Sequence, residues 1–202
     1  MINVIGSNGY IGSNLMREFP RAVGITRDTT WPTFDRDDWV INAASYFWHG
    51  KPLDLNRAWN TNYDIPSRLL ETDANVIHLT SEAAEVRIDD PVWQAKKQGD
   101  DLLIGKAHIL IIPTLYGGIN QHKHMFMTAL LDHIRHGTPF TLTTPNLYRD
   151  FVHIGELITI IRDIIELRFR AIRVHHRLTS WAKIPMLAML KIAEGIAAEI
   201  PR

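Results

Sequence analysis

A short apolar segment that runs directly into three regularly spaced glycines is the feature that most constrains the fold. Residues Ile2–Ile5 predict a buried strand, and Gly6, Gly9 and Gly12 follow it before a helical stretch expected over Gly12–Phe19. Glycines also mark ordinary turns, so the informative point is their place between a strand and a helix. A junction of this kind is typical of the first βαβ unit of a dinucleotide-binding sheet.

Each glycine has a separate physical reason at this junction. Gly6 allows the tight turn, Gly9 lets the backbone approach a pyrophosphate, and Gly12 lets the helix pack closely on the strand. The amide groups and the positive dipole end of the helix then face a bound phosphate. The sequence therefore predicts a dinucleotide site at this turn.

Composition limits the classes of protein that fit. The 202 residues are 46% hydrophobic, enough for one compact domain with a subdomain. Basic and acidic residues balance at 22 each, so net charge attracts neither nucleic acid nor an anionic membrane. Cysteine is absent, which excludes disulfides, thiolate metal sites and a thiol nucleophile. With no signal-like leader and no apolar run near ~20 residues, a cytoplasmic protein without a membrane span is expected.

Apolar runs alternate with helical segments along the chain, which predicts an α/β fold: a Rossmann-like parallel sheet with helices on both faces. The expected strands are Ile2–Ile5, Ala22–Thr26, Trp39–Ala43, Asn75–Thr80 and His108–Ile112. The expected helices are Gly12–Phe19, Ala58–Thr72 and Trp93–Ile104. The turn-rich stretch Thr29–Asp38 indicates that one helix of the usual pattern is reduced or lost.

The pattern changes after Pro113, which divides the chain into a dinucleotide-binding core (1–113) and a small C-terminal α/β substrate lobe (114–202) that partly returns to the core. We expect this lobe over the strand ends, where open α/β sheets bind ligands. Its predicted elements are a helix His122–Arg135, a turn Gly137–Pro139, a strand Phe140–Thr143, a helix Ile154–Arg168, a strand Ala171–His175 and a helix Ile184–Ala198.

Several segments follow one another in the order of a known family. They are Gly6–Gly12, Asn42-Ala43-Ala44, Asn62 with Leu69-Leu70-Glu71, Val76–Ser81, Pro113–Gly117 and Arg149–His153. With these segments the chain resembles the extended short-chain dehydrogenases/reductases, a group of NAD(P)-dependent sugar-nucleotide epimerases, dehydratases and reductases. The resemblance extends from residue 1 to about residue 195.

The resemblance implies roles for individual residues. It implies cofactor contacts at Gly6, Asn8, Gly9, Tyr10, Ile11, Gly12, Ala43, Ala44 and Asn62. It gives Ser81 the role of the catalytic serine or threonine at a strand end, although capping of that strand end is the ordinary alternative. It places Arg149, and with it Tyr116, at a nucleotide-sugar substrate, where the arginine meets the diphosphate; pairing of Arg149 with a nearby carboxylate is the alternative.

One departure from the family puts its chemistry in question. The family has a tyrosine four residues before a lysine on one helix, and here Trp93 and Lys97 occupy those places. Lys97 fits the lysine that binds the nicotinamide ribose, or it is a solvated helix residue. An indole N–H only donates and cannot act as a general base. Tyr46 or His49 is a candidate to replace the lost proton donor, although Tyr46-Phe47-Trp48 also reads as an apolar cluster.

The cofactor preference is read from the residues after the second strand. A cation there suits the 2′-phosphate of NADP, whereas an acid suits the ribose of NAD. Arg27 occupies this place with Asp28 beside it, so NAD or NADP is expected with a slight preference for NADP. No metal is expected, because the histidine pairs at 122/124 and 175/176 lack the i, i+4 spacing of a catalytic zinc site.

Three functions remain open from the sequence. The first is an NAD(P)-dependent epimerase, dehydratase or reductase acting on a nucleotide sugar. The second is a non-catalytic NAD(P)- or nucleotide-binding protein used for sensing or regulation, and the third is a scaffold with a vestigial pocket. The resemblance also implies a homodimer through the helices expected at Ala58–Thr72 and Trp93–Ile104.

Overall fold

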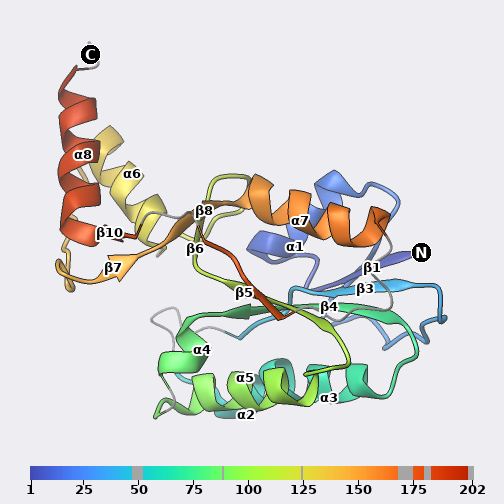
Figure 1. Cartoon of the computed structure of the whole chain (residues 1–202). Helices are drawn as coiled ribbons and strands as arrows, with labels where there is room; N and C mark the ends of the chain where they lie inside the picture. The colour runs from blue at the N-terminus through green and yellow to red at the C-terminus, as the bar shows by residue number, and fades with distance from the viewer. Residues whose placement is uncertain (47–51, 88, 124, 168–174, 180–182, 200–202) are drawn as a thin grey trace.

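A six-stranded parallel sheet forms the centre of the protein in the computed structural model (Figure 1). The structure describes all residues except 47–51, 88, 124, 168–174, 180–182 and 200–202, and the side chains of 193 and 195–199. The strand order is β2-β1-β3-β4-β5-β9. The strands are β1 (Ile2–Ile5), β2 (Val23–Ile25), β3 (Trp39–Asn42), β4 (Asn75–Ser81), β5 (His108–Ile112) and β9 (His175–Arg177). The predicted fold class is confirmed.

Helices cover both faces of this sheet (Figure 1). One face carries α1 (Tyr10–Glu18) and α7 (Ile154–Glu166), which contact each other. The other face carries α2 (Leu55–Trp59), η1 (Asn60–Asp64), α3 (Ile65–Leu70), α4 (Ala83–Val86) and α5 (Pro91–Leu102). Two apolar clusters fill the space between sheet and helices, with Val4, Ile41 and Leu110 in one and Val40, Val76 and Ile109 in the other.

The order of the strands reverses at β1. The chain passes from β1 to β2 on one side and then returns to β3 on the other side, since both β2 and β3 pair with β1 in parallel. Crevices at the carboxyl ends of strands on either side of such a reversal are where doubly wound sheets bind ligands. The fold therefore places a candidate site beside the ends of β1 and β3.

The connection between β2 and β3 contains no helix, as its turn-rich sequence predicted. Residues 26–38 form turns and irregular backbone. Trp31 and Phe34 from this connection meet edge to face, with ring centroids 5.9 Å apart, and pack against the second cluster. Two aromatic rings thus cover an edge of the core that a helix covers in a full doubly wound sheet.

The helix predicted over Ala58–Thr72 is interrupted. Its first and last parts are α2 and α3, and a π-helical turn, η1, lies between them. Proline has no N–H, so Pro66 cannot donate to the carbonyl of Asn62 four residues earlier. That carbonyl faces α5, where a Cβ on Gly99 would lie 2.1 Å from it. Glycine at position 99 therefore allows the two segments to touch.

A small lobe of four elements stands at the carboxyl edge of the sheet: α6 (Phe126–His136), α8 (Met186–Glu199), β7 (Tyr148–Arg149) and β10 (Ile184–Pro185). β7 pairs with β10, and β6 (Thr114–Tyr116) pairs with β8 (Phe151–His153) beneath the lobe. The strand predicted at Phe140–Thr143 is wrong, because these residues form no ladder. The ring of Phe140 instead packs on Phe126 and His133 of α6.

Other boundaries shift from the predicted ones. α6 begins at Phe126 rather than at His122, and the last helix begins at Met186, after β10. The strand predicted over Ala171–His175 lies mostly outside the described residues, and β9 begins at His175.

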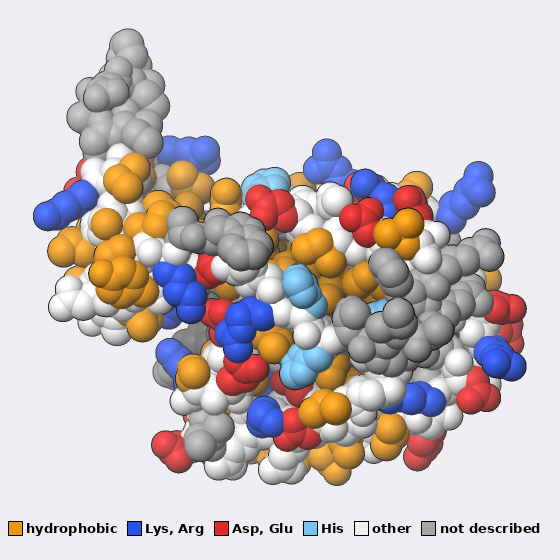
Figure 2. Space-filling view, viewed as in Figure 1, with side chains coloured by type: hydrophobic (Ala, Val, Ile, Leu, Met, Phe, Trp, Pro, Cys, Tyr) orange, Lys and Arg blue, Asp and Glu red, His pale blue; other side chains and the backbone are white. Residues whose placement is uncertain are grey.

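None of the helices among the described residues is long and apolar enough to cross a bilayer. Basic and acidic side chains are interspersed over the face shown in Figure 2.

Candidate functional site

The loop after β1 is held in a conformation that requires glycine. Gly6 has a φ of 79°, and its amide donates to the carbonyl of Ile25 at the end of β2 over 2.9 Å. A Cβ at this position would lie 2.8 Å from the Cα and the amide nitrogen of Ala44. The turn after β1 therefore touches the segment after β3 backbone to backbone.

The first turn of α1 packs on the same loop. A Cβ on Gly12 would lie 2.1 Å from the carbonyl oxygen of Gly6, a distance that no side chain tolerates. Gly9 is the N-cap of α1 and supplies no side-chain hydrogen bond, and the first turn contains no acidic residue. The amino end of the helix thus has neither a side-chain cap nor a carboxylate that would compete with an anion.

Asn8, Tyr10 and Ile11 take different places around this loop. Asn8 is exposed, and Ile11 packs partly buried against the core. The Tyr10 hydroxyl donates to the carbonyl of Gly117 over 2.8 Å, and burial raises the pKa of this phenol above its usual range. Tyr10 therefore ties the glycine loop to the segment that follows β6.

Asn14 makes a second connection to that segment, which the sequence analysis did not identify. Its Nδ2 donates to the carbonyl of Ile119 over 2.8 Å, and its Oδ1 accepts from the Ile119 amide over 3.0 Å. A Cβ on Gly118 would lie 2.3 Å from Oδ1. A buried asparagine on a helix face that otherwise packs on apolar residues was the available signal for this contact.

Arg27 lies two residues beyond the end of β2 and is exposed, as is Asp28. Thr26 and Thr29 shape the turn between them: the Thr29 hydroxyl accepts from the Thr26 amide over 3.0 Å. β2 is followed by a threonine rather than an acidic residue. The structure thus leaves an exposed guanidinium at the strand end where the sequence places cofactor selection.

The two lysines of α5 point in opposite directions. Lys96 is buried, with 3% of its side chain exposed, and its Nζ donates to the carbonyl of Leu79 over 3.2 Å. The side chain of Lys97 is 40% exposed, and its Nζ donates to Oδ2 of Asp101 over 2.6 Å. The structure brings Lys96, and not Lys97, toward β4. The residue one helical turn before Lys96 is Val92, whereas Trp93 precedes Lys97.

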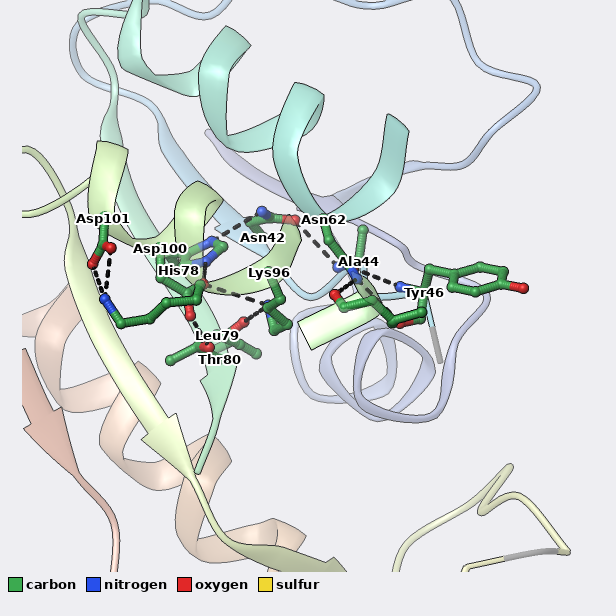
Figure 3. Close-up of polar contacts among 12 residues, drawn as sticks. Asn42, Ala44, Tyr46, Asn62, His78, Leu79, Thr80, Lys96, Asp100 and Asp101 are labelled. Atoms are coloured by element: carbon green, nitrogen blue, oxygen red, sulfur yellow. Dashed lines mark hydrogen bonds and ion pairs between the residues drawn. The ribbon is translucent and has the colours of Figure 1, made fainter. Parts of the chain in front are cut away.

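A buried polar network surrounds Lys96 (Figure 3). Its Nζ lies 3.6 Å from Oδ1 of Asp100, which also binds Nε2 of His78 over 2.7 Å. The other carboxylate oxygen of Asp100 accepts from the Thr80 hydroxyl. Burial raises the pKa of Asp100, but the Lys96 ammonium, His78 and Thr80 outweigh it and hold that pKa below its usual value. Burial lowers the pKa of Lys96, and Asp100 opposes the shift.

Asn62 joins the loop after β3 to the start of α5. Its Oδ1 accepts from the Tyr46 amide over 2.8 Å, and its Nδ2 donates to the carbonyls of Tyr46 and Val92. The Tyr46 hydroxyl accepts from the Asp54 amide over 3.0 Å, and Arg57 lies 5.7 Å from its ring centroid. In Figure 3 the Tyr46 ring points away from His78 and Asp100. His49 lies outside the described residues.

Ser81 ends β4, and its Oγ accepts from the Ala83 amide over 3.2 Å.

Arg149 is half-buried in β7, and its Nη1 lies 3.5 Å from the Thr114 hydroxyl. The buried Nε of Arg149 has no hydrogen-bond partner among the residues that the structure describes. Burial lowers the pKa of Arg149, Arg87 lowers it further, and Glu82 acts in the opposite direction. Tyr116, in β6, stacks edge to face on His153 with centroids 5.2 Å apart.

Within the described part of the chain, no group of three or more acidic or histidine side chains could hold a metal.

The fold matches that of several solved structures. One is MoeE5 in complex with UDP-glucose and NAD, with 17% identity, a TM-score of 0.76, and coverage of 98% of this chain and 82% of that chain. A second is UDP-glucuronic acid 4-epimerase from Bacillus cereus in complex with UDP-glucuronic acid and NAD, with 18% identity, a TM-score of 0.79, and coverage of 98% and 83%. A third is WbmG from Bordetella bronchiseptica in complex with NAD and UDP, with 11% identity, a TM-score of 0.73, and coverage of 99% and 80%. No family model and no curated protein matches the sequence.

Proposed function

We propose that this protein binds NAD or NADP in the crevice between the ends of β1 and β3 and acts on a nucleotide-linked sugar. The contact between Gly6 and Gly12 carries this proposal. A Cβ on Gly12 would lie 2.1 Å from the Gly6 carbonyl, so the loop and the uncapped end of α1 approach as closely as backbone allows. This geometry leaves backbone amides at the crevice to receive a pyrophosphate.

Other residues fit the remaining parts of a dinucleotide. Ala43 and Ala44 form the wall opposite Gly6 and present little side chain to a ligand. Arg27, exposed beyond β2, suits a 2′-phosphate and gives the site a slight preference for NADP. When bound, the nicotinamide would supply the transfer of a hydride. The three solved structures described above contain NAD.

We assign the cofactor lysine to Lys96 rather than to Lys97. An ammonium has three N–H donors. Lys96 uses one on the Leu79 carbonyl and directs a second toward Oδ1 of Asp100, 3.6 Å away. One donor therefore remains for a hydroxyl of a ribose. Lys97 is the alternative that the sequence predicted, but Asp101 holds its Nζ on the exposed side of α5.

The substrate would lie between the end of β4 and β7. Ser81 would donate its hydroxyl proton to a sugar oxygen, and Arg149 would bind the diphosphate of the nucleotide. A half-buried guanidinium whose Nε meets no acceptor in the described part of the chain suits a charge-assisted, bidentate contact of this kind. Tyr116, on the strand beside β8, is the further substrate contact. Tyr46 remains the candidate proton donor, since α5 has no tyrosine.

One observation favours a second candidate, a non-catalytic NAD(P)-binding protein. Val92 and Trp93 are buried with 4% and 6% exposure, and neither carries a group that exchanges protons near neutral pH. Each of the two lysines of α5 thus follows an apolar residue by one turn. The cofactor site is intact in this reading, and the site for proton transfer is not.

A homodimer is also part of the proposal. Large apolar side chains are exposed on and beside α2, α3 and α5, the helices through which the resemblance implies association: Leu53, Leu55, Leu70 and Ile104. Sedimentation of the protein as a dimer, and as a monomer after Leu70→Asp, would support this assignment. Sedimentation of the wild type as a monomer would contradict it.

Turnover of a nucleotide sugar tests which candidate holds. The protein loaded with NAD or NADP is incubated with UDP-linked hexoses and uronic acids, and the products are separated by chromatography. An enzyme converts at least one of them, and Ser81→Ala removes that conversion. Binding of cofactor without conversion of any sugar would instead support the non-catalytic candidate.

A further inference from the structure

The side chain of His78 connects the crevice to Lys96 through hydrogen bonds whose directions are fixed. The Ala44 amide donates to Oδ1 of Asn42 over 3.2 Å, so the Asn42 side chain has one orientation. Its Nδ2 then faces Nδ1 of His78 at 3.0 Å. An amide NH₂ can only donate, so Nδ1 of His78 must accept and carries no proton.

The other ring nitrogen completes the connection. With Nδ1 accepting, the proton of neutral His78 is on Nε2, which donates to Oδ1 of Asp100 over 2.7 Å. Asp100 faces Lys96, whose Nζ lies 3.6 Å from the same oxygen. The path thus runs from Ala44 through Asn42, His78 and Asp100 to Lys96, across β3, β4 and α5 (Figure 3).

All four side chains are buried. Asn42 and His78 are each 1% exposed, Lys96 is 3% exposed and Asp100 is 7% exposed. A polar group buried in this way costs free energy unless its hydrogen bonds are made. One ammonium and one carboxylate balance each other only while the imidazole stays neutral. Burial lowers the pKa of His78, and although Asp100 opposes this, Lys96 adds to it.

We propose that Asn42 and His78 are positioning residues. Their hydrogen bonds form a relay that allows only one arrangement of protons, and this arrangement fixes Lys96 and the Ala43–Ala44 wall at the positions that the cofactor needs. This rests on the proposed binding of NAD(P) near Lys96. A proton on Nδ1 of His78 would meet the NH₂ of Asn42. If the Asn42 amide then rotated to offer its oxygen to His78, its NH₂ would face the Ala44 amide, and two donors would meet there instead. Protonation of Nδ1 therefore breaks either the Asn42–His78 or the Ala44–Asn42 hydrogen bond.

Asn42→Asp tests the relay with almost no change of shape. An aspartate at this position still accepts from the Ala44 amide, but it presents an acceptor to His78. Nδ1 then takes up a proton, and the imidazolium shares Asp100 with Lys96. The expected results are an imidazolium signal for His78 in ¹⁵N NMR and a cofactor affinity at least about fivefold weaker by calorimetry.

Asn75→Asp is the matched control. Asn75 is also a buried asparagine, but it lies at the opposite end of β4, where its Nδ2 donates to the carbonyls of Arg36 and Asp38. A carboxylate cannot donate to those two carbonyls, so the variant loses stability and is compared at a temperature where it is folded. There it should leave both the His78 signal and the cofactor affinity as in the wild type. An imidazolium at His78 in Asn42→Asp with unchanged affinity would overturn the coupling to the cofactor.

The wild type gives a test that depends on no variant. Its ¹⁵N spectrum at neutral pH should show a neutral His78 with the proton on Nε2. A proton on Nδ1 would overturn the relay whatever the variants do. If the wild type bound no dinucleotide, the proposed function would fail, and this spectrum would still confirm or reject the proton arrangement separately.

Discussion

Nζ of Lys96 lies 3.6 Å from Oδ1 of Asp100, one helical turn further along α5, and both side chains are buried. The next pair on the same helix, Lys97 and Asp101, has the same spacing but is exposed. Both pairs consist of a lysine and an aspartate at the same spacing, and they differ in burial. Removing each lysine in turn therefore measures how much burial changes the contribution of such a pair to the unfolding free energy.

Lys96→Met should be far more damaging than Lys97→Met. Loss of Lys96 leaves the Asp100 carboxylate buried without its cation, which costs about 3–5 kcal/mol of unfolding free energy. Loss of an exposed i, i+4 pair costs about 0.3–0.5 kcal/mol. Denaturant unfolding measures both changes. Calorimetry at a temperature where both variants are folded should show weaker cofactor binding for Lys96→Met alone, and weaker binding for Lys97→Met would favour the sequence-based assignment.

Val92→Tyr and Trp93→Tyr separate the two possible positions of the missing tyrosine. A tyrosine at 92 lies one turn before the inward Lys96, whereas a tyrosine at 93 lies one turn before the exposed Lys97. If α5 lacks only its acid–base group, Val92→Tyr should raise turnover of a nucleotide sugar about a hundredfold or more. A gain with Trp93→Tyr and none with Val92→Tyr would show that Lys97 is the cofactor lysine.

The α5 helix also shows where sequence reasoning reached its limit. The glycine loop and most strands were predicted from local pattern, because a strand–turn–helix junction is encoded by neighbouring residues. The direction of a helical side chain changes by about 100° per residue, so an error of one position exchanges a buried lysine for an exposed one. The apolar and small residues Val92, Ala95, Gly99 and Leu103, spaced three or four positions apart, were the signal in the sequence that Lys96 faces inward.

Contacts between distant segments were beyond local pattern. His78 and Asp100 are 22 residues apart, and nothing in either segment alone predicts their bond. The π-helical turn was missed for a different reason: Pro66 was read within a continuous helix although it cannot donate to Asn62. Both features depend on how α5 packs on its neighbours.

His78 should make the protein less stable in mild acid. Its folded pKa is lowered from 6.5, so below that value the unfolded chain binds a proton that the folded chain does not. Stability conferred by neutral His78 is therefore complete above about pH 6.5 and declines toward the folded pKa, by up to about 1.4 kcal/mol per pH unit. His78→Gln should flatten this part of the stability curve, as measured by urea unfolding from pH 7 to 5. An unchanged slope would mean that His78 binds its proton equally in the folded and unfolded chains, so that its pKa is not lowered by folding.

Arg149→Lys should weaken binding of UDP roughly tenfold or more, because an ammonium cannot reproduce the two parallel donors of a guanidinium. Arg162→Lys is the control, since Arg162 pairs with Glu18 between α7 and α1. Calorimetric titration of both variants with UDP gives the comparison. Equal affinities in the wild type and in Arg149→Lys would remove Arg149 from the substrate site.

Calorimetric titration with NAD, NADH, NADP and NADPH tests the central claim most directly, on the wild type and on Gly9→Val. The backbone at Gly9 is extended, a conformation that valine adopts readily. A Cβ there would lie 3.2 Å from the Gly6 carbonyl, so the loop must shift slightly, at some cost in stability, and the side chain blocks a pyrophosphate. We predict that the wild type binds dinucleotides, and NADP or NADPH more tightly than NAD or NADH. A ligand at 100 times its Kd should add ~2.7 kcal/mol to the unfolding free energy. Gly9→Val should still unfold cooperatively, at a somewhat lower temperature than the wild type, and should bind none of the four at a temperature where it is folded. Failure of the wild type to bind any of them, or equal binding by Gly9→Val, would contradict a dinucleotide site at this loop.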